Sequence, residues 1–476
     1  MTDLPVTASP STLSDGDRSA AATIELLRAL IRIPSVNPPS PDLPDGELMA
    51  ARLVADALAD AGIPSELHEP VPGRGSVTAR VRGDGTGGPP LLLLSHLDVV
   101  PAPPDGWTHE PFAGDVADGY VWGRGAVDMK AMAAMEVEVL RRLARRARDA
   151  GRDPAADPIP GLRRDVLFAA TADEEAGGHA GAGWLAAHRP ETLRAAGALN
   201  ECGGVSMELA GRRLYPIQVA EKGFVVYRIT VHGAWGHGSM PRDDNAAVRA
   251  AHVVTRLATP GEARLTGPME RLFAELADTL PPDRRALVAA IAGDDPRRAE
   301  AALRSLCDPV VARATRALLR DTISPDIIRT GVKYNVIPGE ATVEIDCRIL
   351  PGTSEADIRE EVLARLGDLA THCEVELVVA GLPVETSPDT PLFGLLARTI
   401  RAHDPDGVPI PVMAPFATDA KHLASLGTPA YGFSPLRNEP GERFLERFHG
   451  VDERVSVDAI RWGLPVLFDV VAEFCG

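Results

Sequence analysis

Two short runs of purely apolar residues constrain the fold of this 476-residue chain more than any other feature of its sequence. They occupy residues 91–94 and 166–170, and strands of this kind are buried on both faces of a sheet. Apolar residues at helical spacing occur around them, at 24–31, 53–58 and 182–188. Strands that alternate with helices favour a mostly parallel sheet covered by helices on both faces. The sequence therefore predicts an α/β fold.

The pattern changes near residue 221, where longer strands begin. Residues 224–231 form one such strand and residues 341–349 another, in which apolar and polar residues occupy opposite faces. A sheet with one polar face is typical of an antiparallel α+β domain. Between these strands, residues 258–325 are charged and helical, with prolines at intervals. We therefore predict that a smaller α+β domain is inserted into the α/β domain.

These patterns divide the chain into four segments. Residues 1–20 are rich in Ser, Thr, Asp, Ala and Pro and lack the features of a signal peptide, so we predict a disordered tail. Residues 21–218 form the first part of the α/β domain, residues 219–380 the inserted domain, and residues 381–476 the second part of the α/β domain.

Composition limits the partners and the cellular location of the chain. The formal net charge of −18 argues against nucleic acid or an anionic membrane as a partner, because both attract basic surfaces, and the apolar runs are too short to cross a membrane. The five cysteines are widely spaced and form no CxxC pair, which predicts neither a disulfide framework nor a thiolate zinc site. A reduced, cytoplasmic location fits this pattern. The cysteines are Cys202, Cys307, Cys347, Cys373 and Cys475.

A histidine and an aspartate follow the first apolar run. His96 and Asp98 are two residues apart at a predicted strand end, so their side chains point to the same side. Asp98 can then hold the far ring nitrogen of His96, which is how a metal-bound imidazole is oriented. Taken alone, the motif is weak evidence and fits an ordinary core histidine better than a metal ligand.

Acidic residues gather at two further points. Asp128 follows the glycine-containing segment 122–127 at the start of a methionine-rich helix, where an N-cap is the ordinary interpretation. Asp173, Glu174 and Glu175 come directly after the second apolar run. Three adjacent carboxylates repel one another unless a cation lies among them, although a solvated acidic loop is the alternative.

Two more candidate ligands occur later in the chain. Glu201 follows the next apolar stretch, and His449 lies near the C-terminus. Each of them alone would be an ordinary loop residue. Imidazole and carboxylate ligands without thiolate suit catalytic Zn²⁺, Co²⁺ or Mn²⁺ rather than structural zinc. The carboxyl ends of parallel strands are where open α/β sheets place their sites.

Taken together, these separated segments resemble the zinc amidohydrolase family that includes aminoacylase, succinyl-diaminopimelate desuccinylase, glutamate carboxypeptidase and the carnosinases. The resemblance covers almost the whole chain from about residue 20, with the motifs in the family's order and the inserted domain in the same place. It implies that the α/β domain is catalytic and that the inserted domain is a ferredoxin-like lid through which the protein forms a homodimer.

The resemblance also implies two divalent metal ions, Zn²⁺ first, with Co²⁺ or Mn²⁺ as alternatives. One ion would be held by His96, Asp128 and Glu201. The other would be held by Asp128, Glu175 and His449, so that Asp128 bridges the pair.

Further catalytic roles follow from the same resemblance. Asp98 would orient His96, and Glu174 would be the general base that takes a proton from a water bridging the two metals. Relatives carry a cis peptide after the bridging aspartate, so the bond between Asp128 and Met129 is a candidate for that geometry.

Residues that would complete the site are implied by the same comparison. His237 in the inserted domain matches a lid histidine that reaches the partner subunit's site and stabilises the developing oxyanion, whereas a surface histidine in a glycine loop is the alternative. Asn335, Arg348 and Gly432 match positions that contact the substrate. Lys421 departs from the family, because relatives often have arginine there and lysine cannot bind a carboxylate in a bidentate way.

The sequence therefore predicts a metallopeptidase-like enzyme, a metal-dependent hydrolase of the aminoacylase or carboxypeptidase type. Its substrate would be a small molecule with a free carboxylate, an N-acyl amino acid or a dipeptide. The alternatives are a catalytically silent relative that binds a ligand or assembles with partners, and a hydrolase of another small amide or ester such as an N-succinyl amino acid.

Overall fold

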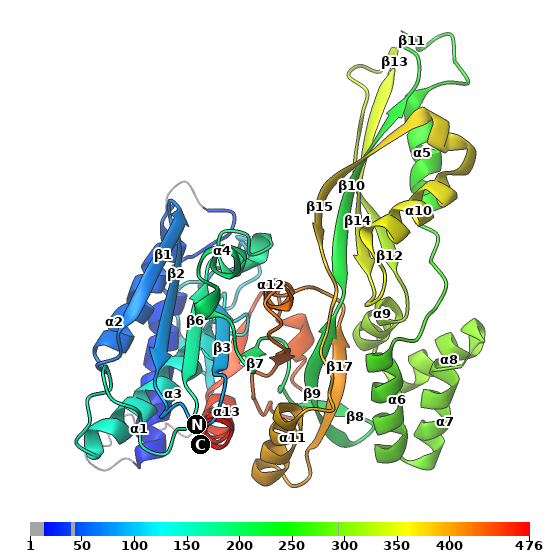
Figure 1. Cartoon of the computed structure of the whole chain (residues 1–476). Helices are drawn as coiled ribbons and strands as arrows, with labels where there is room; N and C mark the ends of the chain where they lie inside the picture. The colour runs from blue at the N-terminus through cyan, green and yellow to red at the C-terminus, as the bar shows by residue number, and fades with distance from the viewer. Residues whose placement is uncertain (1–13, 40–42, 294) are drawn as a thin grey trace. The chain divides into compact units, whose positions relative to one another are not determined.

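The computed structural model describes residues 14–39, 43–293 and 295–476, and Figure 1 draws the whole chain. The described chain separates into two compact units. The first comprises the described residues up to Val219 together with Thr386–Pro411 and Thr418–Gly476, and the second comprises Ala220–Glu385 and Val412–Ala417.

A parallel group of strands forms the centre of the main sheet. The strand order is β1-β2-β6-β3-β7-β18-β9-β16, with β8 and β17 paired to β9. The neighbours β6, β3, β7 and β18 run parallel, whereas β1 and β2 add an antiparallel edge. The bounds are β1 Ser65–Val71, β2 Arg74–Val81, β3 Leu91–His96, β6 Val166–Thr171, β7 Gly197–Asn200, β8 Met207–Leu209, β9 Arg212–Glu221, β16 Val384–Glu385, β17 Val408–Ala414 and β18 Ala430–Gly432.

Helices cover this sheet on both faces, as the apolar runs predict. In β3, Leu91 and Leu93 belong to the large apolar cluster that α1, α2, α3, α11 and α13 complete. Leu92 and Leu94, on the other face, belong to a cluster with α4 and α12. The predicted α/β class is therefore confirmed. The helices are α1 Asp15–Ile31, α2 Gly46–Ala59, α3 Lys130–Asp149, α4 Ala182–His188, α11 Pro391–His403, α12 Ala420–Ala424 and α13 Val457–Cys475.

A small three-stranded sheet accompanies the main one. It has the order β19-β5-β4, with antiparallel pairing throughout. Its strands are β4 Val116–Ala117, β5 Tyr120–Trp122 and β19 Arg454–Ser456. The sheet joins the segment before Asp128 to the segment after His449.

The second unit contains a four-stranded antiparallel sheet of the order β12-β14-β10-β15. Helices α5 and α10 supply the apolar residues that cover one face of it. With the chain order β10-α5-β12-β14-α10-β15, this is the ferredoxin-like arrangement that was expected of the inserted domain. The bounds are β10 Gly223–His232, β12 Thr322–Thr330, β14 Glu340–Ile349, β15 Cys373–Gly381, α5 Ala246–Leu257 and α10 Glu355–Leu366.

Two additions extend this unit. A short antiparallel pair joins β11 Gly236–His237, which follows β10, to β13 Val336–Ile337, which precedes β14. Four helices fill the stretch that the sequence marks as charged and helical, each with proline at its first turn. They are α6 Gly267–Thr279, α7 Pro282–Ile291, α8 Pro296–Leu306 and α9 Pro309–Leu318.

The N-terminal segment differs from the prediction. Residues 15–20 were expected to belong to a disordered tail, but they form the first turns of α1, whereas residues 1–13 lie outside the described part of the chain. The Ser14 side chain caps the helix by accepting a hydrogen bond from the Asp17 backbone N–H. A separate finding is that none of the described helices combines the length and the apolarity needed to span a membrane.

Candidate metal centre

The carboxyl ends of three parallel strands bring the first candidate ligands to one edge of the main sheet. β3 ends at His96, which is paired with Thr171, the last residue of β6. Glu174 and Glu175 follow β6 in a short 3₁₀ turn, and Glu201 follows the end of β7. Because neighbouring parallel strands end at the same edge, residues that are far apart in sequence meet there.

Two groups of potential ligands share one aspartate. His96, Asp128 and Glu201 form one group, and Asp128, Glu175 and His449 form the other. Within each group the candidate ligand atoms lie within 4.8 Å of one another. These are the two ligand sets that the family resemblance implies.

The two oxygens of Asp128 face different histidines. Oδ1 lies 3.0 Å from Nε2 of His96, and Oδ2 lies 3.3 Å from Nε2 of His449. His96 Nε2 is also 3.7 Å from Glu201 Oε2, and His449 Nε2 is 3.2 Å from Glu175 Oε2. A carboxylate with one oxygen toward each group has the geometry of a bridge.

The electrostatics of this cluster favour cations between the groups. Burial raises the pKa of Glu175 to about 7, although the hydrogen bond from His449 acts to lower it. The Oε1 atom of Glu175 is buried, and the described residues supply no hydrogen-bond partner for it. Burial also raises the pKa of Glu201. Carboxylates packed this closely are stable as anions only with positive charge among them. The imidazole and carboxylate set therefore fits Zn²⁺, Co²⁺ or Mn²⁺.

Glu174 lies beside this cluster but belongs to neither ligand group. Burial and then the charge of Glu201 raise its pKa well above the ordinary value, and the Lys421 ammonium acts in the opposite direction. Lys421 Nζ is 3.7 Å from Glu174 Oε1 and donates a hydrogen bond to the Thr418 carbonyl at 2.9 Å. Lys421, which replaces the arginine found in many relatives, therefore contacts the candidate base Glu174.

Asp98 contacts the far ring nitrogen of His96 through its main chain as well as through its carboxylate. The His96 Nδ1 atom hydrogen-bonds the Asp98 backbone carbonyl at 3.0 Å, while the carboxylate Oδ1 is 3.5 Å away. The carboxylate also accepts hydrogen bonds from the backbone N–H groups of Glu174 at 3.1 Å and Glu175 at 3.0 Å. Asp98 thus contacts the ring through both its main chain and its carboxylate, and the same carboxylate holds the acidic turn.

A buried polar network extends from Asp98 to the rest of the acidic turn. Asn37 donates to Asp98 Oδ2 at 2.9 Å and to Asp173 Oδ1 at 3.4 Å. Arg74 forms ion pairs with both Glu47 and Asp173. Glu47 also accepts a hydrogen bond from the backbone N–H of Asp173 at 3.0 Å. The carboxyl of Asp173 also accepts the N–H of residue 180. This network fixes the turn that carries Glu174 and Glu175, and the sequence patterns did not reveal it.

The N-cap interpretation of Asp128 is wrong. Helix α3 begins at Lys130, its N-cap is Met129, and no side chain caps its first turn. The side chain of Asp128 is directed instead to the two histidines. The peptide bond between Asp128 and Met129 is cis, as the resemblance implies.

The predicted lid residues lie at different ends of the second unit. His237 in β11 pairs with Val336, and Asn335 accepts the N–H of Gly238 at 2.9 Å, so His237 and Asn335 are neighbours. Arg348 lies at the opposite end of β14, where its Nε contacts Asp346 at 2.9 Å. Glu340 and Arg348 are eight residue steps apart on an extended strand, or about 27 Å. One copy of this unit therefore keeps His237 and Arg348 well apart.

Gly432 is the last residue of β18, beside the loop that carries Glu201. A Cβ atom at this position would lie 2.4 Å from the Glu201 carbonyl oxygen. Glycine is therefore required for the close approach of β18 to the Glu201 loop. Its contact with a substrate stays a prediction.

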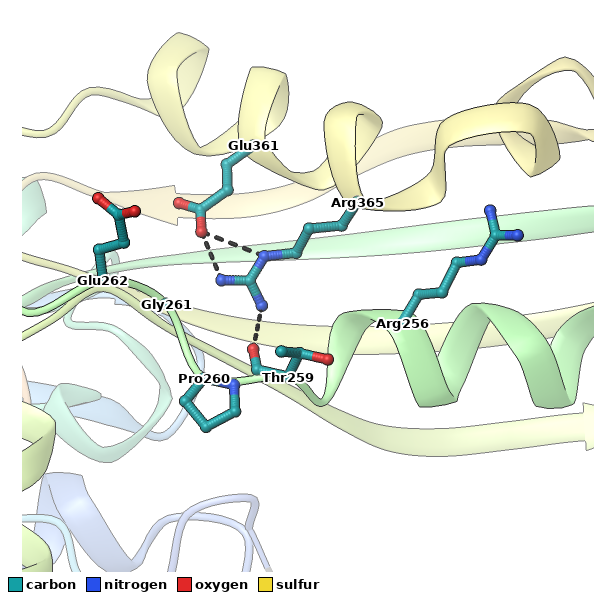
Figure 2. Close-up of a pocket in the computed structure, with 7 residues that line it drawn as sticks. All are labelled: Arg256, Thr259, Pro260, Gly261, Glu262, Glu361 and Arg365. Atoms are coloured by element: carbon teal, nitrogen blue, oxygen red, sulfur yellow. Dashed lines mark hydrogen bonds and ion pairs between the residues drawn. The ribbon is translucent and has the colours of Figure 1, made fainter. Parts of the chain in front are cut away.

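A pocket of about 400 Å³ in the second unit contains none of the predicted site residues (Figure 2). Its Arg365 side chain donates to the carbonyls of Leu257 and Thr259 and contacts Glu361. The guanidinium therefore satisfies carbonyls at the C-terminal end of α5, which is a structural task. We assign no function to this pocket.

Comparison with known proteins connects this geometry to a family. The sequence profile of Peptidase family M20/M25/M40 matches residues 92–473, which is most of the chain and includes all five candidate ligands. The chain belongs to this family. Members of Peptidase family M20/M25/M40 are amide and peptide hydrolases, so the predicted enzyme class is confirmed, and the metal-dependent character of the family agrees with the two ligand groups.

Individual relatives cover nearly the whole length of this M20/M25/M40 chain. It is 28% identical over 457 residues to the N-fatty-acyl-amino acid synthase/hydrolase PM20D1 of Xenopus tropicalis, covering 92% of this chain and 83% of the relative. It is 25% identical to human aminoacylase-1, covering 96% of this chain and 98% of the relative. The structure of an M20 family metallo-carboxypeptidase from Sulfolobus solfataricus matches with a TM-score of 0.69 at 17% identity, covering 95% and 99% of the two chains.

Proposed function

We propose that this protein hydrolyses the amide bond of small N-acyl amino acids, with two divalent cations of which Zn²⁺ is the first candidate. The observation that carries the proposal is the pair of ligand groups that share Asp128, with Glu174 beside them. The relatives named for N-fatty-acyl-amino acid hydrolysis and for aminoacylase activity favour an acylated amino acid over a dipeptide. The substrate carries a free carboxylate.

The proposed roles follow the two groups. His96, Asp128 and Glu201 hold one cation; Asp128, Glu175 and His449 hold the other. When bound, such a pair lowers the pKa of a water and polarises the scissile carbonyl. Glu174 accepts the proton of the attacking water and passes it to the leaving amine.

Glu174 is suited to the role of base by its surroundings. Its side chain is about nine-tenths buried, at 10% exposed, so little solvent competes for the proton it accepts. Lys421 offers a positive charge 3.7 Å from Oε1, which favours the carboxylate before each turnover. The hydrogen bonds from its own N–H and that of Glu175 to Asp98 hold the turn in place while the side chain moves a proton.

His237 is proposed to donate a hydrogen bond to the developing oxyanion. Its Nδ1 faces the backbone N–H of Ser239 at 3.2 Å and the Ser239 hydroxyl at 2.8 Å. An Nδ1 that accepts from a backbone N–H leaves the proton of the neutral ring on Nε2, which can then donate. A donor of this kind contributes about 10²–10³-fold to kcat in acyl-transfer sites.

A homodimer is proposed to bring His237 to the site in trans. Its support is that His237 and Arg348 lie at opposite ends of the second unit, with about 27 Å of β14 between Glu340 and Arg348. Two lid residues so far apart can serve a single small substrate only if different subunits contribute them. Asn335, as the neighbour of His237, would then come from the partner subunit as well.

Mixing two inactive variants tests this arrangement. We expect H237A and E174Q homodimers to be nearly inactive and their mixture, after subunit exchange, to recover about a quarter of the parental activity, because half of the dimers are mixed and each has one intact site. A histidine that acts in cis gives no recovery. Size-exclusion chromatography with light scattering establishes the dimer independently, and mixing two preparations of H237A is the control.

Metal binding is expected to release protons. In the metal-free chain, hydrogen bonds to Asp128 and Glu175 raise the pKa of His449 to about 10, so its ring is protonated at pH 7. A cation must displace that proton from Nε2, and below pH 10 the apparent affinity therefore rises about tenfold for each unit by which the pH increases and for each proton displaced. Calorimetric Zn²⁺ titrations at pH 7 in two buffers of different ionisation enthalpy count the protons. H449N should release fewer; equal heats in both buffers would contradict the expectation.

A substrate panel tests the proposed reaction. N-acyl amino acids with short and long acyl chains, dipeptides and N-succinyl amino acids are incubated with the Zn²⁺-, Co²⁺- or Mn²⁺-loaded enzyme, and the free amine is measured. Turnover of the N-acyl amino acids above the dipeptides supports the proposal. A protein that binds two metals but cleaves none of these amides would be the silent relative instead.

The proposed location is the cytoplasm. Its support is the cysteine pattern, since all five cysteines are free thiols and two of them, Cys347 and Cys475, are buried in the cores of their units. A reducing compartment keeps such thiols unmodified.

A further inference from the structure

Glu453 is a buried carboxylate to which the proposed mechanism gives no task. It lies four residues after His449 and immediately before β19, and its side chain is 0% exposed. A buried carboxylate is costly unless hydrogen bonds and positive charge compensate it. Its partners therefore indicate what it is for.

The partners of Glu453 all belong to the loop that ends in Asp128. One side-chain donor and three backbone donors of residues 124–128 point at the two carboxylate oxygens. The carboxylate accepts from Arg124 Nη1 at 2.6 Å and the Gly125 N–H at 3.0 Å on Oε2, and from the Val127 N–H at 2.8 Å and the Asp128 N–H at 3.1 Å on Oε1.

The main chain repeats this connection. The Glu453 carbonyl accepts the N–H of Gly123 at 2.9 Å, and the next residue, Arg454, pairs with Trp122 in the antiparallel ladder of β19 and β5. The segment that follows His449 is therefore fastened to the whole loop that leads into Asp128. The Glu453 side chain is the part of this connection that reaches the backbone of Asp128 itself.

We propose that Glu453 is a positioning residue that sets the bridging carboxylate of Asp128 relative to His449 and thereby the affinity of the site for its two cations. The inference rests on the proposed metal pair. Asp128 and His449 are 321 positions apart in the numbering, yet their side chains must stay within 3.3 Å. The Glu453 carboxylate links the two segments, because its two oxygens accept four hydrogen bonds from the loop that ends in Asp128.

The four donors around the Glu453 carboxylate, which we call the cradle, require a glutamate at this position. A glutamine has the same shape, but its amide nitrogen would face N–H donors whichever way the amide turned. One pair of donors would lose its acceptor, and the buried Arg124 guanidinium would lose its counter-charge. An aspartate keeps the charge but is one methylene shorter, so it cannot reach all four donors at once. Outer partners of this kind typically change metal affinity by about 10–100-fold.

Asp404 provides a matched control. It is 4% exposed and accepts hydrogen bonds from Arg213 at 2.7 Å and from the Tyr215 hydroxyl at 2.8 Å. Like Glu453 it is a buried carboxylate paired with an arginine, but the contacts above belong to α11 and β9 rather than to the metal loops. The D404N variant therefore removes the charge of a buried carboxylate in the same unit without touching a candidate ligand.

The experiment compares E453Q, E453D and D404N with the parent. Thermal unfolding of the metal-free proteins measures the structural cost, and calorimetric Zn²⁺ titration together with the visible spectrum of the Co²⁺-loaded proteins measures the site. We expect both E453Q and D404N to lower the unfolding temperature, and only E453Q to weaken metal binding, by about 10–100-fold, and to change the Co²⁺ spectrum. E453D should weaken binding by a smaller factor.

The possible results distinguish a role of Glu453 in metal binding from a role in stability alone. Parental Zn²⁺ affinity and an unchanged Co²⁺ spectrum in E453Q would mean that Glu453 serves stability alone, and the inference would be wrong. If E453Q does not fold, E453D decides by the same two measurements, because it keeps the compensating charge. A parent protein that binds no divalent cation would instead overturn the proposed function on which the inference rests.

Discussion

The E174Q variant is expected to retain both metals and to lose turnover by about 10²–10⁴-fold in kcat. Glu174 belongs to neither ligand group, so its replacement leaves all five candidate ligand residues in place. The glutamine amide has the size of the carboxylate but cannot accept the proton of the attacking water. Metal content by mass spectrometry and kcat on the best substrate of the panel check the two halves of this expectation.

The adjacent residue provides the contrast. E175Q removes a member of the second ligand group, so we expect it to lose affinity for one cation as well as activity. If E174Q lost a metal together with turnover, Glu174 would be a ligand, and the assignment of base and ligand to these neighbours would be reversed. Parental turnover in E174Q would mean that another group moves the proton.

The fold could be predicted where burial leaves a pattern in the sequence. β3 and β6 are apolar on both faces, as strands of a sheet covered on both sides are, and the alternation in β14 is typical of a sheet covered on one side. β1 gave no such signal, because it is an edge strand of mostly exposed, polar residues. The early start of α1 did leave a local signal, since Ser14 and Asp17 form a capping pair, but composition alone favoured a tail.

The candidate site could be predicted residue by residue only because the motifs resemble a family. Nothing local in the sequence indicates that Asp128 meets His449, since their contact depends on the β19–β5 pairing and on the course of the loop. The cradle around Glu453 was not predictable for a related reason. It consists mainly of backbone N–H groups, whose directions follow from the path of residues 124–128 and not from their side chains. The same holds for Asp98, which binds the acidic turn through backbone donors.

Replacing the shared aspartate is expected to have the largest effect on metal binding. Asp128 offers Oδ1 to the group of His96 and Oδ2 to the group of His449. In D128N one of these oxygens becomes an amide nitrogen that cannot ligate a cation, and the negative charge that both cations share is lost. We expect D128N to bind neither cation tightly, whereas E201Q and H449A each weaken one of the two sites and leave the other.

The thermal stability of the metal-loaded proteins measures this difference. For the parent, each cation present at a thousand times its Kd stabilises the folded chain by about 4.1 kcal/mol, because it binds the folded state alone. Added Zn²⁺ should therefore raise the unfolding temperature of the parent most, that of E201Q and H449A less, and that of D128N hardly at all. A D128N protein that binds one cation with parental affinity would show that the carboxylate serves a single site. The two ligand groups would then have to be treated as independent centres, because only a shared aspartate couples the loss of one cation to the loss of the other.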